Sequence, residues 1–237
     1  MQATSFSSFS SFGGPIVSGF NSQPFGNLRG EAMDQFTAIG TERCYNRGET
    51  LFAEDETPEN VFVVRSGRVK ISVSSREGKT MILKVAEAGQ VLGLSATLSG
   101  GRHESTAEAF EPCVVTAIAA KDFLGLLNTH PEATREATRW VLNEYQSVFN
   151  DVCRLALPAT VAGRLANLLL DWRKKSQGHI NPRYTMVLTH EEIASMTGTS
   201  RETVTRVLRQ FQREKLISIK GAFLTVLQPQ VLEQLAA

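Results

Sequence analysis

Cysteine is scarce in this chain of 237 residues, and no long apolar run occurs in it. The three cysteines, Cys44, Cys113 and Cys153, lie far apart and form no CxxC pair, so we expect neither a zinc site nor an iron–sulfur site. Isolated thiols of this kind fit a reducing compartment. No apolar stretch approaches the roughly 20 residues that cross a membrane, and no Lys or Arg precedes Arg29, as a signal peptide would require. We therefore expect a cytoplasmic protein that has no membrane partner.

Residues arranged for catalysis are lacking as well. The four histidines, His103, His130, His179 and His190, lie in separate segments of the chain. No nucleophile and base pair, phosphate-binding loop or metal-ligand spacing accompanies them. The sequence therefore predicts no catalytic residues, no metal ion, no cofactor and no enzyme activity.

Charge is distributed unevenly along the chain. Residues 160–237 hold 11 Lys and Arg against 6 Asp and Glu, whereas residues 1–159 hold 14 against 18. A basic part beside an acidic remainder is typical of a separate module that binds a polyanion. Residues 1–27 combine Ser, Gly and Phe with almost no charge, which predicts a disordered N-terminal extension.

Short β-type runs separated by glycine occupy residues 28–130. They read TLFAE, NVFVVRSGRVKISVSS, TMILKVAEAGQVLGL, STAEAF and CVVTAIA. Several short strands with turn residues between them are typical of a sandwich or barrel. We predict that this part is a β-roll.

Residues 131–158 follow a helical pattern that ends at Pro158, which predicts one long helix and a hinge. Positions with spacings of four and three form a heptad seam: Thr134, Thr138, Val141, Tyr145, Val148, Val152 and Leu155. We interpret this seam as a dimerisation surface, with a helix buried in its own domain as the alternative. A second stripe is expected to pack back on the β-roll, and consists of Leu142, Phe149 and Ala156.

Residues 159–237 contain the most informative segment, LTHEEIASMTGTSRETVTRVLRQFQREKLISIKGAFLTVL. Thr189 and Glu192 form a capping-box pattern that begins one helix, and Gly198 ends it. Thr199 or Ser200 can cap a second helix, which is basic and amphipathic. Two short helices joined by a glycine turn predict a helix-turn-helix, and the alternating residues around Lys220 predict a hairpin that makes the domain winged.

The polar face of the second helix has the chemistry to read DNA. Arg can bind two guanine acceptors in the major groove, and Glu can accept from a cytosine amino group. We assign base reading to Arg201, Glu202, Thr205 and Arg206. Contacts to phosphate, which set register, are assigned to Thr189, Ser200, Thr203 and Arg209. A merely solvated polar face is the alternative.

From about Leu28 to its C-terminus the chain resembles the Crp/Fnr family of bacterial transcription regulators. The resemblance is carried by RGETLFAEDE from Arg47, VFVVRSGRVKI from Val61, EGKTMILKVAEAGQVLGL from Glu77 and TGTSRETVTRVL from Thr197. It implies an α+β protein with a cyclic-nucleotide-binding-like β-roll (28–130), a dimerisation helix (131–158) and a winged helix-turn-helix (159–237). It also implies a homodimer that binds double-stranded palindromic promoter DNA and contacts RNA polymerase.

Three residues of the second helix match the family's base-reading positions, namely Arg201, Glu202 and Arg206. The Arg at the first position is similar to the cyclic-AMP receptor branch and implies a TGTGA-like half-site. Thr205 differs from the glycine of that branch and is similar to the serine of the Fnr branch.

The resemblance also locates an effector pocket, with the candidate residues Gly93, Leu94, Ser95, Arg102, His103, Glu104 and Ser105. A cyclic-AMP pocket of this family has Glu after the glycine and Arg about ten residues on. Here Leu94 takes the first position, and His103 or Glu104 takes the second. Leucine accepts no hydrogen bond and a glutamate repels phosphate, so we do not expect cyclic AMP in the usual pose, although Arg102 could substitute.

The runs GLSA, SGxxH and TAEAFEP are similar to the Fnr and FixK side of the family, but Cys44 stands alone where Fnr has a cysteine cluster. We therefore expect a DNA-binding regulator whose effector is unknown. The alternative within the family is a regulator that responds to a cyclic nucleotide or cyclic di-GMP through a non-standard pocket. A regulatory subunit directed at a protein target is the alternative outside it.

Overall fold

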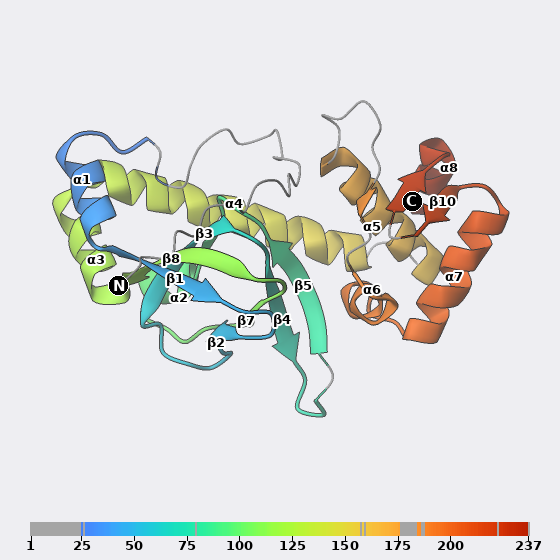
Figure 1. The fold of residues 1–237 in the computed structure, drawn as a ribbon, viewed down its shortest axis with the longest axis horizontal. Helices are drawn as coiled ribbons and strands as arrows, with labels where there is room; N and C mark the ends of the chain where they lie inside the picture. Colours follow the sequence, from blue (N-terminus) through green and yellow to red (C-terminus); the bar gives the residue numbers. More distant parts are fainter. Residues whose placement is uncertain are drawn as a thin grey trace, which may run out of the picture.

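The arrangement of the chain is seen in a computed structural model, which describes residues 25, 27–78, 80–156, 158, 160–175, 184–185, 188–221 and 223–236. A β-roll and a smaller C-terminal domain are joined by one long helix, α4, which runs along the roll (Figure 1). Apart from Phe25 and Asn27, the predicted N-terminal extension lies outside the described residues.

The β-roll consists of two four-stranded antiparallel sheets. One has the order β1-β8-β3-β6, with the strands Gly40–Tyr45, Cys113–Ala119, Asn60–Ser66 and Val91–Leu92. The other has the order β2-β7-β4-β5, with the strands Thr50–Phe52, Thr106–Ala109, Val69–Ser74 and Thr80–Ala86. Inward-facing residues of both sheets form one buried cluster, which includes Phe62, Ile71, Ala107 and Val115. The alternation seen in the sequence therefore forms the predicted roll.

Helices cover one side of the roll and create a second core. They are α1 (Glu31–Ala38), α2 (Leu94–Ser99), α3 (Ala120–Thr129) and the first turns of α4 (Pro131–Ala156). Ala133 and Ala137 of α4 are buried here, together with Phe123 and Leu126 of α3. The small alanines allow the two helices to approach closely, so this end of α4 belongs to the roll.

The folded part of the chain begins earlier than the sequence indicates. Phe25 is fully buried, and its ring lies 4.8 Å from Phe36 and 5.6 Å from Phe123 between ring centroids. The side-chain amide of Asn27 donates to the buried carboxylate of Glu136 at 3.0 Å. The prediction of disorder up to residue 27 is therefore wrong for Phe25 and Asn27, because an aromatic ring that fills the core outweighs the polar composition around it.

The second half of α4 carries an exposed apolar stripe that differs from the predicted seam. Leu142, Tyr145, Phe149 and Val152 are each more than half exposed, and Val148 is 44% exposed. The expectation that Leu142 and Phe149 pack back on the β-roll is wrong. Instead Val141, which was assigned to the dimer surface, packs against its own core. The side chains of Leu155 and Ala156 lie outside the described residues.

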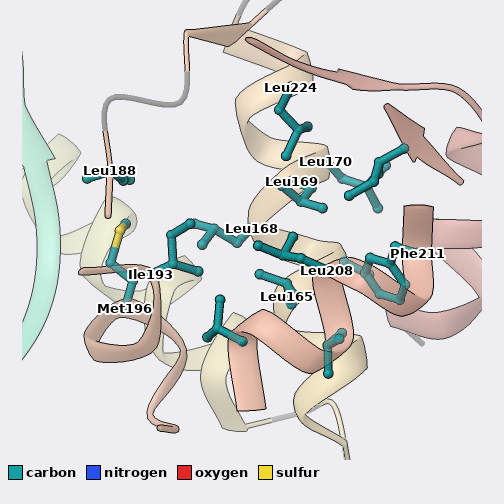
Figure 2. Close-up of a cluster of buried hydrophobic side chains, with 14 of the residues drawn as sticks. Leu165, Leu168, Leu169, Leu170, Leu188, Ile193, Met196, Leu208, Phe211 and Leu224 are labelled. Atoms are coloured by element: carbon teal, nitrogen blue, oxygen red, sulfur yellow. The ribbon is translucent and has the colours of Figure 1, made fainter. Parts of the chain in front are cut away.

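The C-terminal domain is built from helices around a small sheet. Its helices are α5 (Val161–Lys175), α6 (His190–Thr197), α7 (Arg201–Arg213) and α8 (Pro229–Ala236). The hairpin β10 (Ile217–Lys220) and β11 (Phe223–Val226) is the predicted wing, and β9 (Tyr184–Thr185) adds to it in the order β10-β11-β9. Side chains from α5, α6, α7 and β11 converge in one core, among them Leu169, Ile193, Leu208 and Leu224 (Figure 2).

The C-terminal domain also packs against the roll. Helix α6 lies beside β5 (Figure 1), and Ile82 of β5 is part of the same buried cluster as the C-terminal core. The Lys84 ammonium of β5 forms an ion pair with Glu144 of α4 at 3.0 Å. Strand β5 of the roll therefore contacts both the long helix α4 and helix α6 of the helix-turn-helix.

We predict that adding a methyl group at Gly163 destabilises the fold. A Cβ at this position would lie 2.5 Å from the carbonyl oxygen of Leu235, where α8 crosses α5. Gly163→Ala should therefore lower the free energy of unfolding by about 1–3 kcal/mol, measured by urea denaturation. Gly125→Ala is the matched control, because a Cβ at this helical glycine would meet open space, and it should stabilise by about 0.5–1 kcal/mol. Equal effects of the two substitutions would contradict the close packing of α5 and α8.

Candidate nucleic-acid interface

A side-chain cap marks the first turn of each helix in the helix-turn-helix. Thr189 and Glu192 form the predicted capping box at the start of α6, where the Thr189 backbone N–H donates to the Glu192 carboxylate at 2.7 Å. Helix α6 ends at Gly198, which has the left-handed conformation that the turn requires. Of the two residues that could cap the next helix, Ser200 does so, because its side chain accepts from the backbone N–H of Thr203. The caps and the glycine therefore fix where α6 begins, where it ends and where α7 begins.

Helix α7 is divided into a buried face and a basic face. Its buried stripe, which packs into the C-terminal core, consists of Val204, Val207, Leu208 and Phe211. The opposite side forms an open hollow lined by Arg201, Glu202, Thr205, Arg206, Arg209, Gln212 and Arg213. We call this the arginine face of α7. Burial of the apolar stripe forces the arginines outward, so the packing of the domain determines where they point.

The charged groups of the arginine face are free to bind an external partner. Within the described part of the chain, Arg206 and Arg209 make no ion pair. A hydrogen bond from its own backbone N–H lowers the pKa of Glu202, and the Ser200 hydroxyl and the charge of Arg201 add to this effect. Glu202 is therefore an ionised acceptor between cationic donors, which is the combination that reads guanine and cytosine edges.

Thr205 differs from the other residues assigned to base reading. Its hydroxyl donates to the carbonyl oxygen of Arg201 at 2.9 Å and lies 2.8 Å from Nδ1 of His190 on α6. The sequence contains no signal for this contact, because the two residues are brought together only by the turn. The hydroxyl proton of Thr205 is therefore used within the protein.

The residues assigned to phosphate contacts lie at the two helix starts and along α7. Thr189 is engaged in the capping box, and the hydroxyls of Ser200 and Thr203 lie 3.1 Å apart. Arg209 is exposed on the arginine face. Two of the four, Thr189 and Ser200, therefore also serve as helix caps, and only Arg209 lines the arginine face. Arg213, which the sequence places on the polar stripe of this helix, and Gln212, which it did not assign, extend the same face by one turn.

A second hollow lies on the roll, and only part of the predicted effector pocket lines it. The lining residues are Glu54, Asp55, Arg102, His103 and Glu104. The first two come from the loop after β2 and were not expected from the sequence. Leu94, which was assigned to the pocket, is instead buried in the core beneath α1, α3 and α4. Ser95 is exposed and Ser105 is half-buried, and neither lines the hollow.

His103 fills the inner end of this hollow. Its ring stacks on Phe52 with 3.9 Å between ring centroids, and the residue is 5% exposed. Gly93, which has a φ of +76°, makes room for it, since a Cβ there would lie 3.3 Å from Cε1 of His103. Burial lowers the pKa of His103, while the charges of Glu104 and Glu56 oppose that shift. Of the two residues that the sequence offered for this position, His103 points inward and Glu104 is exposed.

Arg102 is held at the rim of the hollow. Its guanidinium donates to the backbone carbonyl of Asp55 at 2.5 Å and lies 4.0 Å from the Asp55 carboxylate. Three carboxylates, those of Glu54, Asp55 and Glu104, share the rim with this one arginine. The balance of charge disfavours an anionic ligand in this hollow.

The described residues show neither a metal cluster nor a spanning helix. They include no group of three or more His, Cys, Asp and Glu side chains that could hold a metal ion. Cys44 is exposed, Cys153 is half-buried, and burial raises the pKa of the Cys113 thiol. No helix among them combines the length and the apolar character needed to cross a bilayer.

Comparison with known proteins identifies both halves of the chain. Residues 42–130 match the cyclic nucleotide-binding domain, and residues 163–235 match the Crp-like helix-turn-helix domain. The cAMP-activated global transcriptional regulator CRP of Pasteurella multocida is 29% identical over 77% of this chain and 88% of its own length. The fumarate and nitrate reduction regulatory protein of Vibrio cholerae is 27% identical over 90% of this chain and 85% of its own length.

A solved structure shows the same fold. FixK2 from Bradyrhizobium japonicum superposes with a TM-score of 0.74, covering 84% of this chain and 98% of its own, at 23% identity. The predicted order of β-roll, long helix and winged helix-turn-helix is thereby confirmed. With a cyclic nucleotide-binding domain, a Crp-like helix-turn-helix and relatives that regulate transcription, the chain belongs to the Crp/Fnr family of DNA-binding transcription regulators, which are not enzymes.

Proposed function

We propose that this protein acts as a homodimer that binds palindromic promoter DNA, with α7 of each protomer in a major groove, and contacts RNA polymerase there. The observation that carries this proposal is the arginine face of α7, which the buried stripe of the same helix turns toward solvent. The contact with RNA polymerase is supported by the relatives, whose names describe regulators of transcription.

Base reading is assigned to the first turn and a half of α7. Arg201 and Arg206 are exposed and supply bidentate donors for guanine, and the ionised Glu202 supplies an acceptor for a cytosine amino group. Each such contact contributes about 1–3 kcal/mol of discrimination between bases. Arg209 and the capped helix starts are suited to phosphate, which sets the register without reading sequence.

The exposed stripe on α4 supports pairing with a second copy of the chain. Leu142, Tyr145, Phe149 and Val152 follow one another at spacings of three, four and three, which is the pattern of a coiled-coil seam. A stripe of this kind is complementary to itself, as a two-fold axis requires. Two-fold symmetry would present the two copies of α7 to half-sites about 34 Å apart, which is one turn of DNA.

The effector is a separate part of the proposal. We infer that cyclic AMP does not bind in the usual pose, because His103 occupies the inner end of the hollow and carboxylates surround its rim. Response to a cyclic nucleotide or cyclic di-GMP in a different pose is the second candidate. The match of residues 42–130 to the cyclic nucleotide-binding domain and the position of Arg102 at the rim favour it.

Arg206→Ala tests base reading, and Arg209→Ala is its matched control. Arg206→Ala should remove about 1–3 kcal/mol of discrimination at one base pair of each half-site, measured by fluorescence anisotropy on operator variants. Arg209→Ala should weaken binding to all variants alike and reduce the salt slope by roughly 0.9 for each lost phosphate contact. Unchanged discrimination in Arg206→Ala would remove this residue from the reading set.

Phe149→Glu tests the dimer. The substitution would bury two unpaired carboxylates at the proposed two-fold seam, which should weaken association by about 3–5 kcal/mol. Sedimentation equilibrium should then show a monomer with reduced affinity for a palindromic duplex. Gln146→Glu adds the same charge to an exposed polar position of α4 and should leave the dimer intact. A Phe149→Glu protein that remains dimeric would show that the stripe is not the interface.

Titration with nucleotides tests the pocket. Addition of cyclic AMP, cyclic GMP or cyclic di-GMP should leave the affinity of the protein for its operator unchanged, because His103 occupies the inner end of the hollow and the rim is acidic. The measurement is operator binding over a range of each nucleotide, with Arg102→Ala as the companion variant. A large gain in affinity with cyclic AMP that Arg102→Ala abolishes would favour the second candidate instead.

A further inference from the structure

One contact within the helix-turn-helix is not explained by base reading or by capping. His190, the first residue of α6, lies with Nδ1 2.8 Å from the hydroxyl oxygen of Thr205 on α7. That hydroxyl also donates to the backbone carbonyl of Arg201 at 2.9 Å. The two hydrogen bonds join the first helix of the motif to the arginine face of the second.

The position of the protons follows from these two bonds. A carbonyl oxygen only accepts, so the single proton of the Thr205 hydroxyl is directed at Arg201. Nδ1 of His190 must therefore carry a proton and donate it to Thr205. In the neutral ring this leaves Nε2 as a bare acceptor, whereas in the charged ring Nε2 also carries a proton.

His190 begins the helix that is expected to cross the DNA backbone. The first helix of a helix-turn-helix crosses the phosphates while the second enters the groove. His190 is half-buried beside Thr205, which itself lines the arginine face. Within the described part of the chain, the hydrogen bond of the His190 ring is made by Nδ1, and Nε2 has no hydrogen-bond partner.

Charged residues of both helices lie near His190 and Thr205 in the sequence. On α6 they are Glu191, which is exposed, and Glu192, which the capping box engages. On α7 they are Arg201 and Arg209, one turn before and after Thr205, together with Glu202. Approach of a phosphate adds negative charge at Nε2. A bare Nε2 repels this charge, and a protonated Nε2 donates to it.

We propose that His190 is a phosphate contact that forms only when its imidazole is protonated, so that DNA binding takes up a proton from solvent at Nε2. The bond to Thr205 holds the ring through Nδ1 and leaves Nε2 to bind the phosphate. This inference rests on the proposed DNA binding by α7 and adds a dependence on pH to it. Affinity for DNA would then rise as the pH falls.

The experiment compares the full-length protein with two substitutions at this position. His190→Gln can still donate to Thr205 but does not titrate, and His190→Lys carries a charge at every pH of the assay. Binding is measured from pH 6 to 8 on a palindromic duplex with TGTGA half-sites and on a random duplex of the same length. His130→Gln is the matched control, because His130 lies between α3 and α4, on elements that belong to the roll.

The wild-type protein should bind roughly three- to tenfold more tightly at pH 6 than at pH 8, within the limit of tenfold per pH unit for each protomer. Its salt slope should be steeper at pH 6 by up to roughly 0.9 per protomer, because a phosphate contact is added. His190→Gln should bind weakly and His190→Lys tightly, both with little dependence on pH. His130→Gln should retain the wild-type dependence. Calorimetry in two buffers of different ionisation enthalpy should show proton uptake only where His190 is present.

Three results would overturn the inference. His190→Gln that keeps the wild-type dependence on pH would show that another group titrates. A loss of affinity by the same factor at every pH, with an unchanged salt slope, would show that His190 only braces Thr205. Failure of the wild-type protein to bind either duplex at any pH would overturn the proposed DNA binding itself, and thermal unfolding of each variant confirms that the compared proteins are folded.

Discussion

The burial of one stripe of α7 is the interaction on which the rest of the proposed function depends. Val204, Val207, Leu208 and Phe211 are almost fully buried against α5 and α6. Each contributes about 1.5–3 kcal/mol from apolar burial. The helix therefore has one stable rotation about its axis. That rotation directs Arg201, Arg206 and Arg209 to solvent, and among the described residues no ion pair holds them, so hydrophobic packing positions a charged surface.

The long helix α4 likewise has a buried part, which packs on the roll, and an exposed part, which we propose as the dimer seam. Its first turns present Ala133 and Ala137 to α3, and its later turns leave Leu142 to Val152 exposed. The same helix contacts β5 through Lys84 and Glu144, and β5 lies beside α6. A change in the roll that moved β5 would therefore displace both α4, which carries the proposed dimer seam, and α6 of the helix-turn-helix. The roll has the fold of the family, but the His103 ring, stacked on Phe52, occupies the inner end of the hollow.

Most of the architecture could be predicted from the sequence, because it depends on local patterns. Alternation and glycine spacing predict the roll, and the residues from Thr189 to Arg213 predict both helices of the motif with their caps. Errors occurred where a residue's partner is distant in the chain. Phe25 lies in a polar tract, yet it packs against Phe123. The two apolar stripes of α4 are adjacent on the helix, and only the position of α3 and the roll decides which of them is covered.

The sequence by itself determined the order of domains, the helix caps and the residue types on the polar face of α7, since each follows from periodicity or from residues within four positions. Only the tertiary structure decided that Leu94 turns into the core, that His103 fills the hollow and that His190 meets Thr205. These contacts join residues on different elements. Their geometry is set by the packing of whole helices and strands, which no local pattern encodes.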